Sequence, residues 1–371
     1  MEQRNYISIN IDGRTYNLES PGGELAELLT QLCNYFFAHQ NYSSMAFRQG
    51  TRNYFSSHPT DPKAHDHYFN AFTPLWTLLQ QAGLYTYAGR VWPQALKPVL
   101  EWEEENKTQV HKGTPYYFWA CTVLLVGDLD RGFHLMHRAL EEDERSCGLE
   151  TPDTPGNAFV TLNSERKEQF LYQDVKAMAD YLETHIQKYR NQRNRTLDLA
   201  GFQKRFLSNP LLRSEAFLFV YLLFKLRATD ARQIEGLAAS DFAGVLRLNL
   251  LFDFCLVTDR LIKHKYWNEK ALFPPLILYV AQRSVVTLSE KLVREISKKV
   301  KDDPALAFEE ILGGRVCNAV LEGSAIDLAV SVGVRNLGAH RVAAQDIISK
   351  HFAELLFGVL NTLFLSIEVL Y

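Results

Sequence analysis

The feature that most constrains this chain is a series of long apolar stripes at helical spacing, with no strand–helix alternation between them. From about residue 200 to 371, five stripes follow one another, beginning in SEAFLFVYLLFKLRA, GVLRLNLLFDFCLV, PPLILYVAQRSVV, AIDLAVSVGVRNL and QDIISKHFAELLF. Apolar residues that recur every three or four positions predict amphipathic helices, and several in succession predict a bundle. The predicted fold class is therefore all-α, and the pattern argues against a Rossmann-type sheet.

The N-terminus is the exception to this helical pattern. β-Forming residues in 6–11 and 16–18 flank Asp12-Gly13. An Asp-Gly pair between such runs predicts a small β-hairpin, because glycine tolerates the positive φ of a tight turn. Ser20-Pro21 then predicts a helix start. Residues 42–67 are polar, contain two prolines and show no period, which predicts a loop.

A repeat follows from about residue 68. Five positions recur at an offset of 44 residues, with Gly83, Ala88, Trp92, Ala95 and Leu96 matching Gly127, Gly132, Met136, Ala139 and Leu140. Small residues at regular places let two helices approach closely, so each unit is predicted to be a helical hairpin. The spacing resembles the tetratricopeptide repeat, although the offset is longer than that family's period. Two units cover 72–143, and a third is placed in 164–190.

The segment NQRNRTLDLAG is the predicted domain boundary because it is basic, polar and ends at a glycine. It separates an N-terminal region, 1–195, from a C-terminal helical bundle, 196–371. The net charge of −3 provides no overall basic field. Five scattered cysteines without a CxxC pair indicate neither a disulfide framework nor a zinc site. We therefore expect a cytoplasmic protein without a membrane span, in which the apolar run 355–367 is a buried core helix.

The sequence carries no phosphate-binding or metalloprotease motif, and we expect neither a cofactor nor a metal ion. His58, His65 and His67, with Asp61 and Asp66 nearby, have residue types that ligate metals. The competing interpretation is a solvated polar loop.

The segment 334–341 lies between two apolar helical stretches and contains Arg335, Asn336 and His340 in the pattern Arg-polar-x-x-x-His. Here the chain resembles the HEPN superfamily, whose ribonuclease members carry this pattern near the end of a helical bundle. Asp259 to Lys263, in an earlier apolar helix, resembles that family's acidic-leucine-lysine stretch, with Asp where Glu is more usual. The resemblance covers about residues 212–371. Arginine-to-histidine spacing of this kind recurs at 52–58 and 131–137, but neither follows a bundle helix.

The resemblance implies a metal-independent endoribonuclease that cleaves single-stranded RNA and leaves 2′,3′-cyclic phosphate ends. Arg335 would stabilise the transition state, His340 would act as acid and base, Asn336 would position, and Asp259 would hold the basic residues. These types suit the chemistry, because imidazole titrates near neutral pH and guanidinium binds phosphate oxygens through a planar fork. The family also implies a homodimer with a composite site, and a role as a toxin or antiviral-defence effector.

Other interpretations of these residues stay open. Arg335 would instead cap a helix or pair with Asp327, or the bundle would be an inactive HEPN-like module. A different class of function is a non-catalytic scaffold that dimerises through its C-terminal bundle. Such a scaffold would bind a protein partner or inhibitor in a groove of the repeats, lined by Trp76, Tyr85, Trp92 and Tyr117.

Two basic clusters give mild support to an RNA partner. They comprise Lys188, Arg190, Arg193, Arg195, Lys204 and Arg205 in one, and Lys291, Arg294, Lys298, Lys299 and Lys301 in the other. A charged run is also what a solvated helix face looks like.

Overall fold

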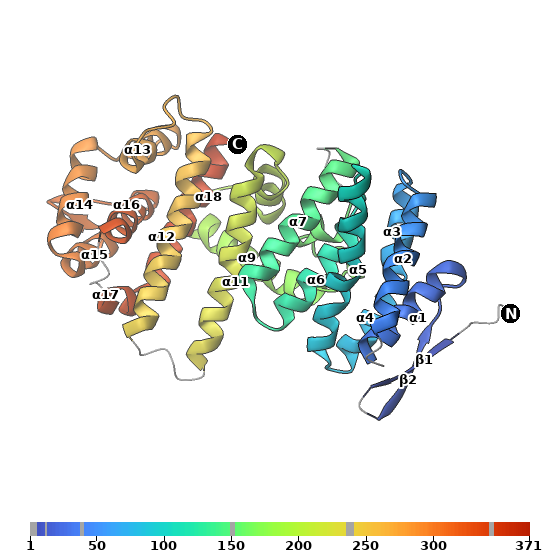
Figure 1. The fold of residues 1–371 in the computed structure, drawn as a ribbon. Helices are drawn as coiled ribbons and strands as arrows, with labels where there is room; N and C mark the ends of the chain where they lie inside the picture. The colour runs from blue at the N-terminus through green and yellow to red at the C-terminus, as the bar shows by residue number, and fades with distance from the viewer. Residues whose placement is uncertain (1–5, 12, 38–40, 149–152, 235–240, 341–344) are drawn as a thin grey trace. The chain divides into compact units, whose positions relative to one another are not determined.

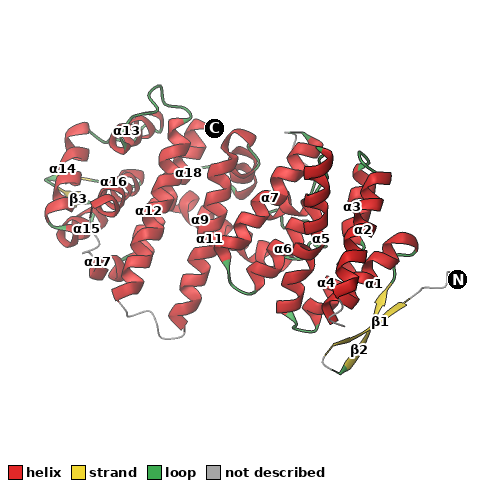
Figure 2. Cartoon of the chain, viewed as in Figure 1, coloured by secondary structure: helices red, strands yellow, loops and turns green. Residues whose placement is uncertain are grey.

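A computed structural model describes residues 6–371 except 12, 38–40, 149–152, 235–240 and 341–344. The protein is mostly helical with a small N-terminal antiparallel hairpin, which confirms the predicted fold class (Figure 2). Two compact units divide the chain, Met1–Asn157 (unit 1) and Ala158–Tyr371 (unit 2). The division falls before the helix at residue 172 rather than at the predicted boundary after 195.

The elements of unit 1 are β1 (Tyr6–Ile11), β2 (Arg14–Glu19), α1 (Gly23–Phe37), α2 (Asn41–Ser57), α3 (Pro62–Asn70), α4 (Thr73–Gln81), α5 (Tyr85–Asn106), α6 (Gly113–Leu125) and α7 (Leu129–Cys147) (Figure 1). The short helix α8 (Pro155–Val160) spans the division.

Unit 2 continues with α9 (Tyr172–Arg193), α10 (Leu199–Phe202), a π-helical turn (Gln203–Leu207), a 3₁₀ turn (Pro210–Leu212), α11 (Arg213–Ile234), α12 (Asp241–Lys263), α13 (Phe273–Arg283), α14 (Glu290–Asp302), α15 (Pro304–Leu312), β3 (Arg315–Val316), β4 (Ala319–Val320), α16 (Ser324–His340), α17 (Gln345–Lys350) and α18 (Phe352–Leu370). The third predicted C-terminal stripe is therefore two helices, α13 and α14, and the fifth is α17 and α18.

The predicted N-terminal hairpin is present. β1 and β2 pair in register from Tyr6 opposite Glu19 to Ile11 opposite Arg14, and Gly13 has φ of +80°. Asp12, the other turn residue, lies outside the described residues. Helix α1 begins at Gly23, later than the Ser20-Pro21 signal, because Gly22 and Gly23 both adopt positive φ.

The predicted loop at 42–67 is wrong, since α2 and α3 occupy most of it. The helical period is carried by Phe47, Thr51, Tyr54 and Phe55, all buried. Their spacing of four, three and one places them on one face of a helix. Thr51 interrupts the apolar stripe in the sequence, but its hydroxyl is satisfied by the Phe47 carbonyl oxygen at 2.9 Å, as polar groups in a core must be.

The repeat corresponds to two helical hairpins, α4–α5 and α6–α7. Gly83 and Gly127, which are 44 residues apart, both lie in the turn between the paired helices with φ of +72° and +85°. Gly132 packs against Leu124, close enough that a Cβ would lie 2.5 Å from that side chain. A third repeat in 164–190 is wrong, because turns occupy the first residues and one helix, α9, covers the rest.

Helix α9 belongs to unit 2 because buried polar contacts attach it there. The Tyr189 hydroxyl donates to Glu368 at 2.6 Å, and Arg193 binds Asp327 through two hydrogen bonds of 2.6 and 2.9 Å. These partners lie on α18 and α16, far along the sequence. The basic, polar segment after α9 has the composition of a linker. The residues of α9 just before it, however, form hydrogen bonds with α16 and α18.

Helices α12, α16 and α18 form the centre of unit 2, where they pack against one another (Figure 1). Ser331 on α16 donates to Thr362 on α18 at 2.8 Å, so the shared core contains satisfied polar groups. Helix α18 is long and apolar enough to cross a membrane by length and composition, yet most of it is buried within this unit. That burial is what the expected core helix at 355–367 requires.

Candidate functional site

The structure brings together two of the predicted site residues, Asp259 on α12 and Arg335 on α16. An Oδ2 of Asp259 lies 3.7 Å from Nη2 of Arg335. The same carboxylate lies 2.9 Å from Nζ of Lys263, one helical turn further along α12. Asp259 is 5% exposed, so two cations compensate the burial of its charge. The carboxylate thus contacts two basic side chains, one on its own helix and one on α16.

The guanidinium of Arg335 is positioned by more than this ion pair. Its Cζ lies 4.7 Å from the ring centroid of Phe252, a cation–π contact. Nε of Arg335 is buried and has no hydrogen-bond partner among the described residues, whereas the side chain as a whole is 26% exposed. A guanidinium held at one edge and one face can offer its exposed part to a phosphate.

Gly338 permits the contact between Phe252 and Arg335. A Cβ at position 338 would lie 2.3 Å from Cδ2 of Phe252, far inside van der Waals contact. The glycine one turn after Arg335 therefore sets how closely α12 and α16 approach beside the guanidinium. Neither Phe252 nor Gly338 carried a sequence signal, because their role depends on which two helices pack together.

The remaining predicted site residues lie on the same helix. The side-chain amide of Asn336 donates from Nδ2 to the backbone oxygen of Ser297 on α14 at 2.7 Å. Asn336 therefore connects α16 to α14. His340 is the last residue of α16, but its side chain lies outside the described residues, and so do residues 341–344.

The alternative partner for Arg335, Asp327, is occupied elsewhere. Asp327 is 1% exposed and accepts both hydrogen bonds from Arg193. Burial raises the pKa of Asp327 even though Arg193 opposes the change. The two acidic groups of this region thus each hold a different arginine, and Arg335 belongs with Asp259.

Cys255 lies one turn before Asp259 on α12 and is fully buried. Burial raises the pKa of its thiol well above the ordinary value, although the nearby positive charge of Arg335 acts in the opposite sense. A thiol kept protonated in the core is a poor nucleophile. Cys255 is therefore a core residue rather than a candidate nucleophile.

The histidine cluster of unit 1 does not come together as one site. His65 is 3% exposed, with Nε2 3.1 Å from the His58 carbonyl oxygen, whereas His67 is exposed. Among the described residues, no three His, Cys, Asp or Glu side chains are placed to hold a metal ion.

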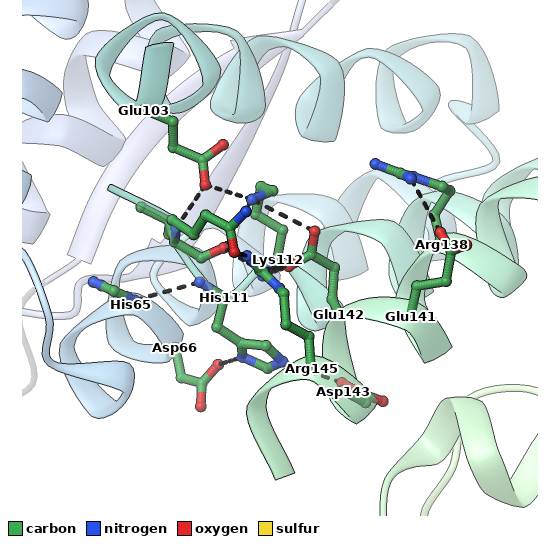
Figure 3. A network of polar contacts seen from close by, with 12 residues as sticks. His65, Asp66, Glu103, His111, Lys112, Arg138, Glu141, Glu142, Asp143 and Arg145 are labelled. Carbon is green, nitrogen blue, oxygen red and sulfur yellow. Dashed lines mark hydrogen bonds and ion pairs between the residues drawn. The ribbon is translucent and has the colours of Figure 1, made fainter. Parts of the chain in front are cut away.

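His65 and Asp66 instead join a polar network that also contains His111 (Figure 3). Nδ1 of His111 lies 3.0 Å from Asp66 and Nε2 lies 3.2 Å from Asp143. Burial disfavours the charged ring, but the hydrogen bonds to Asp143 and Asp66 outweigh it and raise the pKa of His111 to about 9. At neutral pH this imidazolium connects α3 to α7.

Lys112 extends the same network. Its Nζ lies 2.5 Å from Glu103 and 3.5 Å from Glu142, and it donates to the Val110 carbonyl oxygen at 2.8 Å. The side chain is 5% exposed. These contacts secure the connection between α5 and α6, the segment whose length makes the repeat offset unusual. Because His111 and Lys112 each contact two acidic side chains, the network is structural rather than a ligand site.

The proposed peptide groove of the repeats is not formed as predicted. Trp76, Trp92 and Tyr117 are 1%, 0% and 5% exposed, and only Tyr85 of the four is exposed. The indole of Trp76 donates to Thr122 at 2.7 Å inside the core. These aromatic residues are therefore packing residues, which is their commonest role at helical spacing.

The two basic clusters differ in how many of their side chains are bound to other groups of the protein. Around the expected linker, Arg193 is committed to Asp327, and Arg205 donates to the Glu368 carbonyl oxygen at 3.2 Å. On α14, the residues on one exposed side are Lys291, Arg294, Lys298 and Lys301. Ser297, which binds Asn336, lies on the flank of this side, so the basic face of α14 adjoins the end of α16.

Comparison of the chain with protein families, with curated proteins and with solved structures finds no match. The candidate site therefore rests on its own residues and geometry.

Proposed function

We propose that unit 2 is a metal-independent endoribonuclease that cleaves single-stranded RNA and leaves 2′,3′-cyclic phosphate ends. The observation that carries the proposal is the contact between Asp259 and Arg335. These residues are 76 positions apart in the chain, and their side chains lie 3.7 Å apart on adjacent helices.

In the proposed reaction, His340 accepts the proton of the 2′-hydroxyl, whose oxygen attacks the neighbouring phosphorus. The bond to the 5′-oxygen breaks, and that oxygen takes a proton from an imidazolium. A histidine suits both steps because its pKa lies near neutral pH. Negative charge gathers on the non-bridging oxygens, where the donors of Arg335 would bind. No redox partner or cofactor enters this balance.

Asp259 is a positioning residue in this scheme. It contacts Arg335 and Lys263 rather than the reacting atoms, and it orients the guanidinium. We further propose a homodimer in which the second copy contributes its own Arg335 and His340, so that base and acid come from two chains. The cellular role that fits such a reaction is that of a toxin or antiviral effector.

The test is to incubate the purified protein with labelled single-stranded RNA in EDTA. We expect cleavage that leaves cyclic phosphate ends. His340→Ala should slow it roughly 10²- to 10⁴-fold and Arg335→Ala about 10²- to 10³-fold, since these are usual losses for an acid–base group and for a charge-stabilising donor. Asp259→Asn should give a smaller loss.

Arg227→Ala is the matched control, because Arg227 is an exposed arginine paired with Asp174 and lies outside both basic clusters. Circular dichroism and sedimentation establish that each variant is folded and has the parent's oligomeric state. A folded His340→Ala protein that cleaves as fast as the parent contradicts the proposal. Retention of one stoichiometric protein partner with no effect on RNA would favour the scaffold.

A further inference from the structure

The turn that follows α12 exposes aromatic and basic side chains together. Trp267 is 84% exposed, an unusual state for the largest apolar side chain. Its ring lies 5.4 Å from that of Tyr266, which in turn lies 5.2 Å from Tyr279 on α13. Tyr279 also donates to the Lys265 carbonyl oxygen at 3.3 Å, so α13 holds this turn.

Two cations of this region lie against aromatic rings. Cζ of Arg283 lies 5.1 Å from the ring centroid of Tyr279, and Nζ of Lys265 lies 4.7 Å from that of Tyr371. Lys265 and Arg283 are exposed, and neither forms an ion pair within the described part of the chain. We call Lys265, Tyr266, Trp267, Tyr279 and Arg283 the α12–α13 platform. Glu269 is the acidic residue next to it in sequence, and it is exposed.

The platform begins two residues after the end of α12, the helix that carries Asp259. Lys263 touches Asp259 at 2.9 Å and is the last residue of α12, and Lys265 follows two residues later. Lys263 lies one turn beyond Asp259, about 6 Å along the helix axis. Basic side chains therefore follow one another from Arg335 through Lys263 to the platform.

We propose that the α12–α13 platform binds an unpaired stretch of the RNA strand whose cleavage is proposed at Arg335, with a base stacked on Trp267. Exposed aromatic rings accept any unpaired base, and unpaired cations beside them attract the phosphate backbone. Bases inside a duplex cannot reach such a surface. This inference rests on the proposed function, to which it adds the reason for a single-stranded substrate.

The test measures RNA affinity rather than cleavage. A short fluorescein-labelled single-stranded RNA is titrated with the full chain carrying His340→Ala, which removes cleavage, and anisotropy is followed at fixed salt. Trp267→Ala should weaken binding roughly 5- to 100-fold, the range that loss of one stacked base gives. Trp267→Phe should retain most of the affinity, and a duplex of the same sequence should bind equally to all three proteins.

Lys167→Ala is the matched control, since Lys167 is an exposed lysine before α9 and lies outside the platform and outside both basic clusters. It should change affinity far less than Lys265→Ala. Tryptophan fluorescence gives a second signal, because Trp76, Trp92 and Trp102 are buried. Quenching by RNA that disappears in Trp267→Ala supports direct stacking.

The outcomes separate the two proposals. Equal RNA affinity of Trp267→Ala and the parent, in a protein that cleaves RNA, overturns the platform alone. RNA binding that depends on Trp267, in a protein whose parent form never cleaves, supports the platform and contradicts the nuclease. If Trp267→Ala instead converts a dimer to a monomer with unchanged RNA affinity, the platform is a subunit interface and the proposal is wrong.

Discussion

The position of the Arg335 guanidinium depends on its neighbours in the fold. Its guanidinium is set by a carboxylate from α12, by the ring of Phe252, and by the absence of a side chain at Gly338. Removing the carboxylate, removing the ring or filling the space at Gly338 should each displace the guanidinium. Filling the space at Gly338 is the most specific of these three changes, because it leaves every polar partner of the guanidinium in place.

We therefore expect Gly338→Ala to damage the site while the fold survives. The new Cβ would lie 2.3 Å from the Phe252 ring, so the ring must move. Arg335 would then lose its cation–π contact with that ring. Overpacking of this kind costs about 1–3 kcal/mol of unfolding free energy. The proposed nuclease activity should fall by far more than that loss of stability accounts for.

Gly333→Ala on the same helix is the comparison for this prediction. There the Cβ would lie 2.9 Å from Phe308, on α15. We expect a similar loss of stability in urea unfolding but nearly normal cleavage of RNA. Equal loss of activity in both variants would mean that α16 is sensitive everywhere and that Gly338 has no particular role.

Sequence reasoning found the pair Asp259 and Arg335 because a family resemblance connected two segments that propensity alone cannot connect. It did not find Phe252 or Gly338, since a ring and a glycine acquire meaning only when the packing of α12 on α16 is known. Trp267 was also missed, although the run KHKYW placed it directly after two lysines and a histidine. Exposure decides the meaning of such a tryptophan, and exposure is a tertiary property.

At the scale of elements, the repeat gives the clearest case of a sequence pattern with a physical cause. A Cβ at Gly132 on α7 would lie 2.5 Å from the side chain of Leu124 on α6. A Cβ at Gly89 on α5 would lie 3.7 Å from its nearest neighbour, the Thr122 methyl group. The two helical glycines thus differ in what a methyl group would meet.

Gly132→Ala should lower the unfolding free energy by about 1–3 kcal/mol, because its Cβ has no room. Gly89→Ala should leave stability unchanged or raise it by up to about 1 kcal/mol, since alanine is the better helix former. Urea unfolding of both variants measures the difference. Comparable losses in the two would show that the helix contact does not set the requirement for glycine.

The missed helices α2 and α3 belong to this scale as well. Their buried stripe includes Thr51 and His65, which a hydropathy pattern counts as breaks. Each is satisfied by a backbone group in the fold, so its polarity costs little. A helix whose core face contains such residues is hard to see from periodicity, whereas the strongly apolar helices of unit 2 are easily seen.

At the scale of the whole molecule, the two units differ in what holds their helices together. In unit 1, charged groups from α3, α5 and α7 converge on His111 and Lys112 (Figure 3). In unit 2, hydroxyl and amide groups connect α16 to α18, with bonds to Asp327 among them, and none of these bonds involves a histidine. The two units should therefore respond differently to pH.

The pKa of His111 is about 9 in the folded protein, above the ordinary value of 6.5. Its stabilisation is accordingly complete below about pH 6.5 and is lost as the pH rises through 9. The loss is of the order of 3 kcal/mol at most, assigned to unit 1. Urea unfolding between about pH 6 and pH 10 should show this slope in the parent.

His111→Gln is the reference for that measurement, because glutamine keeps polar contacts with Asp66 and Asp143 but does not titrate. The comparison with this variant removes the contribution of other groups that ionise at high pH. We expect the stability difference between the two proteins to shrink as the pH rises. A constant difference would show that the ring is not held in its charged form.

The order of the helices in unit 2 has a consequence for how its core is built. Helices α9, α12 and α16 all precede the helix that completes their core, so during translation they are made before their common partner. Domains usually fold as units as they emerge, N-terminal first, so unit 1 has its whole core while unit 2 is still incomplete. The proposed site on α12 and α16 thus lies in a core that includes a helix made after both of them.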